Sequence, residues 1–60
     1  MSITLFEKQS GNLSGIIRFE KDSPLYHVYI SYFGQRIYSN AFPTMEKAKR
    51  ALQRNMKRYA

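Results

Sequence analysis

The chain has 60 residues, of which 43% are hydrophobic and 15% aromatic, and it has a formal net charge of +6. A chain this short has room for one small core, and its apolar content exceeds that of disordered chains, so residues 1–60 are predicted to fold as a single domain. Cysteine is absent and histidine occurs once, which argues against a disulfide framework and a metal site.

Several further classes of protein are disfavoured by the sequence. No window approaches the roughly 18 apolar residues of a membrane span, and no basic head followed by an apolar run is present at the N-terminus. We therefore expect a cytoplasmic or nucleoid-associated protein that has no membrane partner. The chain has no glycine-rich phosphate loop, paired carboxylates or nucleophile motif. We expect no enzyme activity, no catalytic residue, no cofactor and no small-molecule substrate.

Residues 1–14 are predicted to form an N-terminal arm or edge strand followed by a loop. The alternation in Ile3 to Lys8 fits either a short strand or an ordered arm. Gln9 to Gly15 contains two glycines and Asn12, which permit positive φ, so this segment is predicted to be a loop.

Residues 15–42 are predicted to form three antiparallel strands. The first strand, Ile16 to Lys21, is broken by the proline that follows, and the second, Tyr26 to Phe33, is rich in β-branched and aromatic residues. A turn at Gly34-Gln35 or at Phe33-Gly34 then leads into a third strand. In either register the apolar face carries Ile17, Phe19, Val28, Ile30, Tyr32, Ile37 and Ala41. The exposed face carries Arg18, Glu20, His27, Tyr29, Ser31, Phe33, Arg36, Tyr38 and Asn40.

Residues 44–59 are predicted to form one amphipathic helix that covers the apolar face of the sheet. Thr44 is a good N-cap, and Glu46 is favoured by the positive end of the helix dipole. The apolar stripe contains Met45, Ala48, Ala51, Leu52, Met56 and Tyr59. The predicted fold is therefore α+β, with a three-stranded antiparallel sheet packed on one C-terminal amphipathic helix and with residues 1–14 as an extra strand or an arm.

The junction between sheet and helix has the pattern Phe-x-Thr-x-Glu-x-Ala-x-x-Ala, formed by Phe42, Thr44, Glu46, Ala48 and Ala51. This pattern resembles the junction in plant AP2/ERF domains and in the related N-terminal arm-binding domains of phage and transposon integrases. The resemblance implies a sheet whose exposed face binds in the major groove of DNA. The chain differs from these families in lacking both a glycine just before the junction phenylalanine and the Arg- and Trp-rich strands of the plant domains.

Charge favours a polyanionic partner. Residues 44–60 contain six basic residues and one acidic residue, whereas residues 1–43 have a net charge of only +1. Our leading hypothesis is a small protein that binds double-stranded DNA. Its candidate DNA-binding residues on the sheet are Arg18, Tyr29, Ser31, Arg36, Tyr38 and Asn40. Its candidate phosphate-contacting residues on the helix are Lys47, Arg50, Arg54, Lys57 and Arg58.

Two other hypotheses remain open. The chain could be a small regulator of the phage or mobile-element type, which binds an acidic host protein through the aromatic sheet face or the basic helix. It could also bind RNA by stacking bases on Tyr29 and Tyr38. The predicted fold poses a geometric difficulty for DNA binding, because the basic side of the helix points away from the exposed sheet face. One duplex could contact both only along the sheet rim or at the helix ends.

Overall fold

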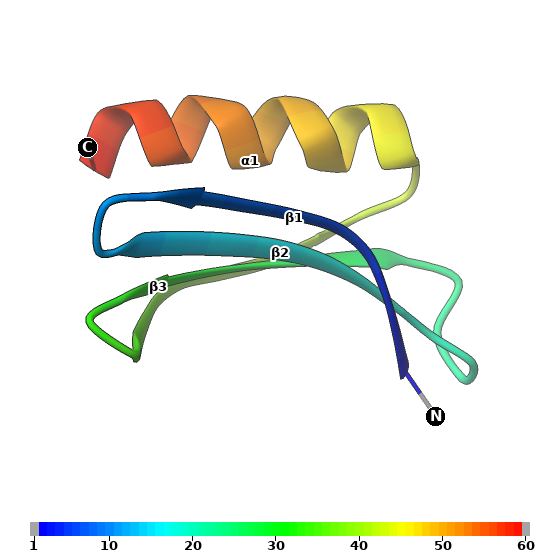
Figure 1. The fold of residues 1–60 in the computed structure, drawn as a ribbon. Helices are drawn as coiled ribbons and strands as arrows, with labels where there is room; N and C mark the ends of the chain where they lie inside the picture. Colours follow the sequence, from blue (N-terminus) through cyan, green and yellow to red (C-terminus); the bar gives the residue numbers. More distant parts are fainter. Residues whose placement is uncertain (1, 60) are drawn as a thin grey trace.

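The computed structural model describes residues 2–59 of the chain. It contains β1 (Ser2–Ser10), β2 (Leu13–Glu20), β3 (Tyr26–Tyr32), β4 (Gln35–Phe42) and α1 (Met45–Tyr59). The strands form one antiparallel sheet in the order β1-β2-β3-β4, and α1 lies over one face of it (Figure 1). The α+β class and the C-terminal helix are thus confirmed, and the N-terminal segment is a full strand.

β1 and β2 form a hairpin where the sequence predicted a loop. Its two-residue turn begins at Gly11, whose φ of 61° favours glycine. Leu13 therefore already lies in β2, and only 2% of it is exposed. Gly15 does not form a turn but lies in β2, where it leaves room for the helix. A Cβ added there would lie 2.8 Å from the Sδ of Met56 and closer still to Leu52.

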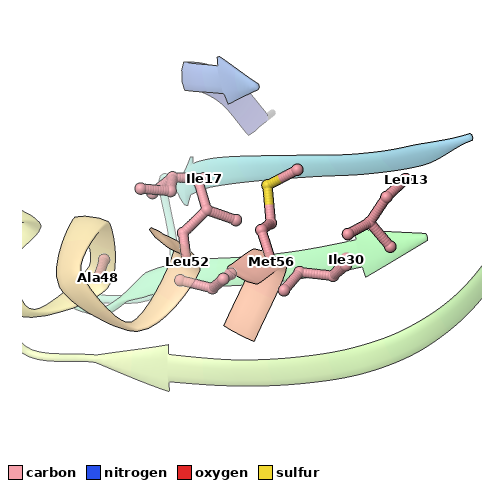
Figure 2. Close-up of a cluster of buried hydrophobic side chains, with 7 residues drawn as sticks. Leu13, Ile17, Ile30, Ala48, Leu52 and Met56 are labelled. Carbon is pink, nitrogen blue, oxygen red and sulfur yellow. The ribbon is translucent and has the colours of Figure 1, made fainter. Parts of the chain in front are cut away.

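One layer of buried side chains joins the sheet to the helix (Figure 2). Its members are 0–3% exposed and are Leu13, Ile17, Val28, Ile30, Ala48, Leu52 and Met56. The Oγ1 of Thr44 accepts a hydrogen bond from the backbone N–H of Lys47 at 3.2 Å, which confirms the predicted N-cap. Tyr59, which was expected in the apolar stripe, is 43% exposed. The fully buried part of the core thus consists of three helical side chains set against two central strands.

The turn into β4 lies at one of the two predicted positions, but a bulge in β4 changes which side chains face the helix. The turn is Phe33-Gly34, so Tyr32 pairs with Gln35 and Ser31 pairs with Arg36. The next pair is Ile30 with Tyr38, which leaves Ile37 as an extra residue. Such a β-bulge reverses the alternation of all residues that follow it in the strand.

Because of the bulge, the predicted faces of four residues in β4 are wrong. Tyr38 and Asn40, expected on the exposed sheet face, lie on the helix side, where Tyr38 packs against the core. Ile37 and Ala41, expected in the core, do not contribute to it, and Ile37 is 40% exposed. Tyr32 was also expected in the core and is 45% exposed. The helix side of β4 is therefore aromatic and polar, with Phe42 in place of the predicted alanine.

Candidate nucleic-acid interface

A groove of about 370 Å³ runs between β4 and α1. Its strand side is formed by Tyr38, Asn40 and Phe42, which the bulge at Ile37 turns towards the helix. Its helix side is formed by Lys47, Arg50, Ala51, Arg54 and Asn55. The groove thus has an aromatic side and a strongly cationic side, and each side contributes one amide side chain.

Helical spacing explains why the cations gather on this flank. Lys47, Arg50 and Arg54 are three and four residues apart, so they lie on one side of α1, next to Ala51. Arg58 follows Arg54 by four residues and continues the same row. The only acidic side chain among residues 45–59 is Glu46, whose carboxylate lies 3.6 Å from the guanidinium of Arg50. Both side chains are about four-fifths exposed, so this ion pair is weak and leaves Arg50 open to an anion.

The polar groups of the groove are held in place by short-range hydrogen bonds. Asn40 donates from Nδ2 to the hydroxyl of Tyr38 at 3.4 Å, and its Oδ1 accepts from the backbone N–H of Ala41 at 2.8 Å. Asn55 donates from Nδ2 to the carbonyl oxygen of Ala51 at 2.8 Å. The two bonds of 2.8 Å orient both amides.

The sheet face opposite α1 has a different character. The guanidinium of Arg36 lies 4.3 Å from the ring centre of Tyr29, which in turn stacks on His27 at 6.2 Å. The Nε2 of His27 lies 3.1 Å from the Oγ of Ser23. Planar groups thus follow one another across this face from β3 to β4.

Charge on this open face is balanced. The register places Arg18 and Arg36 there, and it also places Glu7 and Glu20 there. The equal number of cations and acids gives this face little net attraction for phosphate. The helix side of the groove, in contrast, has three cations. The nearest acid of the helix, Glu46, does not line the groove.

The predicted site residues therefore separate into three groups. Four lie on the open sheet face and are Arg18, Tyr29, Ser31 and Arg36. Five line the groove and are Tyr38, Asn40, Lys47, Arg50 and Arg54. Lys57 and Arg58 lie in the last turn of α1, outside the groove lining. The structure thus unites residues that the sequence had assigned to opposite sides of the molecule.

Phe42, Ala51 and Asn55 were missed as site residues. A signal for Phe42 exists in the sequence. Because Phe42 is a large apolar residue only three positions before the helix, it is expected to face the core. Strict alternation from the turn at Gly34 instead places it on the opposite face. That conflict indicates an extra residue in the strand, and with it the helix-facing positions of Tyr38 and Asn40.

No protein-family model, curated protein or solved structure gives a significant match to this chain. Within residues 2–59, no helix combines the length and apolar character needed to cross a membrane. Among the same residues, no three His, Cys, Asp or Glu side chains are grouped so that they could hold a metal ion.

Proposed function

We propose that this protein binds double-stranded DNA along the edge formed by β4 and α1. The observation that carries the proposal is the bulge at Ile37, which directs Tyr38 and Asn40 towards the row of helix cations. A duplex can then contact strand and helix residues at one rim of the molecule. This arrangement removes the geometric difficulty noted above, because the duplex no longer has to reach both the basic side of the helix and the opposite face of the sheet.

The dimensions of the cationic row suit a DNA strand. From Lys47 to Arg58 the helix rises by roughly 16 Å, at 1.5 Å per residue. Because the phosphates of one strand also wind around the duplex axis, a straight row of this length runs beside only a few of them. Lys47, Arg50, Arg54 and Arg58 are placed to contact phosphate oxygens, which fixes the position of the protein but does not read the base sequence.

The resemblance to AP2/ERF and integrase arm-binding domains would instead direct DNA to the open sheet face. Arg18, Tyr29, Ser31 and Arg36 remain there, and Arg36 already stacks on Tyr29. Two acids on the same face oppose phosphate binding, which is why the edge of β4 and α1 is the stronger candidate. The two surfaces share no residue, so mutation can separate them.

The test is fluorescence anisotropy with a labelled random duplex at three salt concentrations. Neutralising three or four phosphates gives a slope of about −3 to −4 for log affinity against log salt. Arg50→Ala with Arg54→Ala is expected to reduce the magnitude of that slope by about two. Lys8→Ala with Lys21→Ala removes the same charge from exposed positions away from the groove and serves as the matched control.

Arg18→Gln with Arg36→Gln tests the open face in the same assay. If this pair loses the salt dependence and the Arg50, Arg54 pair does not, the interface is the open sheet face and the proposed edge is wrong. If no duplex binds even at low salt, DNA binding itself is refuted. An acidic protein partner then becomes the next hypothesis to test.

A further inference from the structure

The groove between β4 and α1 is too small to enclose a duplex but has room for a small ligand. Its volume of about 370 Å³ lies at the lower end of the roughly 300–1,000 Å³ typical of small-molecule sites. A duplex can lie only across its rim. Duplex binding by the cationic row therefore does not account for the interior of the groove.

The lining of the groove is suited to a ligand that is flat and apolar at one end and anionic at the other. Tyr38 and Phe42 are half-buried, and they pack against the core, so their rings are held in place. Lys47, Arg50 and Arg54 are exposed along the opposite side. Aromatic rings that stack bases, next to cations that bind phosphate, are the two parts of single-strand recognition.

The two amides add hydrogen-bonding groups for the edge of a base. Asn40 and Asn55 belong to opposite sides of the groove, and each is oriented by a bond to the protein. Since the Nδ2 of Asn55 is bound to the carbonyl of Ala51, its Oδ1 is the atom placed to accept from a base amino group.

We propose that this groove binds one unpaired nucleotide of DNA. The base stacks on Tyr38 and Phe42, and the adjoining phosphate is bound by Lys47, Arg50 or Arg54. This inference rests on the proposed function, because it uses the same edge of the molecule, and it adds a preference: a duplex with one unpaired nucleotide binds more tightly than a fully paired one.

The experiment compares three labelled duplexes of equal length by fluorescence anisotropy at one salt concentration. The first is fully paired, the second has one extra unpaired adenine, and the third has an abasic sugar in place of that adenine. The adenine duplex is expected to bind at least about fivefold more tightly than the other two, which is the effect of one stacked base. The abasic duplex controls for the flexibility of the DNA.

Two variants locate the effect in the groove. Tyr38→Leu keeps an apolar side chain against the core and removes the aromatic ring. Ala51→Gln places a larger side chain in the groove without changing the net charge, and glutamine is a good helix former. Both are expected to lose the preference for the unpaired adenine while keeping the salt dependence measured with the random duplex. Tyr32→Leu removes an aromatic ring outside the groove and is expected to keep the preference. Ala51→Gln serves the test even if Tyr38→Leu fails to fold.

The outcomes distinguish the two proposals. Equal binding of all three duplexes refutes the nucleotide site and leaves duplex binding intact. Equal binding of the adenine and abasic duplexes, above the paired one, also refutes it, because the DNA's flexibility and not a base is recognised. Binding of the adenine duplex alone supports the nucleotide site and refutes general duplex binding. If none of the three binds, both proposals are wrong.

Discussion

Replacing Gly15 with alanine tests how closely the helix approaches β2. An added Cβ would lie 2.8 Å from the Sδ of Met56 and nearer still to the Cδ1 of Leu52, both of which are buried side chains of α1. Overpacking of this kind costs about 1–3 kcal/mol. At a position without such contacts, the same change stabilises by about 0.4–1 kcal/mol, because the unfolded chain loses conformational freedom. The sign of the effect therefore decides whether the contact exists.

Urea unfolding followed by circular dichroism measures this effect. At about 0.05–0.15 kcal/mol per residue, a chain of 60 residues has a total stability of about 3–9 kcal/mol. A loss of 1–3 kcal/mol therefore lowers the midpoint clearly, with an unchanged slope. Leu52→Val in the same chain makes room for the new methyl, so the double variant should lose at least about 0.5 kcal/mol less than the sum of the single losses. An unchanged or raised midpoint for Gly15→Ala would refute this packing.

Two further predictions concern local backbone geometry. Phe33 is 65% exposed and has a φ of 52°. Residues other than glycine, Asn and Asp rarely adopt this backbone conformation. Phe33→Asn is expected to raise the melting temperature by about 4 °C, since relief of strain outweighs the lost ring contact with Tyr32, and a lower melting temperature would contradict this. Thr44→Ala is expected to cost about 1 kcal/mol in urea unfolding through loss of the N-cap bond to Lys47, whereas Thr44→Ser retains it; equal stability of the two variants would show that the cap is unimportant.

The helix was predictable because its signals are local. Thr44, Glu46 and the spacing of Ala48, Leu52 and Met56 lie within four turns of one another, and the structure contains the expected helix from Met45 to Tyr59. The break after β2 was also predicted from a local signal, Pro24, and β2 ends at Glu20, before that residue. Such features depend on neighbouring residues and hardly at all on the rest of the fold.

The N-terminal hairpin was hidden by glycines with different roles. Gly11 provides the positive φ of a turn, whereas Gly15 provides room for the helix inside a strand. Only the second role depends on residues about 40 positions away, Leu52 and Met56. Two nearby glycines are also typical of a loop, which is why residues 9–15 were predicted to form one.

The groove was not predicted because it depends on a one-residue irregularity in β4, whose only sequence signal is the conflict at Phe42. Side chains along a strand point alternately to the two faces of the sheet. The extra residue Ile37 therefore moves Tyr38 and Asn40 to the opposite face. The chemical character of the candidate residues was recognisable from their types and charges. Which of them lie together became visible only from the register of β4 and the position of α1 beside it.

The most direct test of the proposed interface is an NMR titration of the labelled protein with a short random duplex. The side-chain amides of Asn40 and Asn55 report on the groove, and the backbone amides of Arg50 and Arg54 report on the cationic flank. We expect these signals to shift progressively with added duplex at low salt and to recover at high salt. Shifts confined to the open-face residues Arg18, Tyr29, Ser31 and Arg36, with the groove signals unchanged, would contradict the proposed interface.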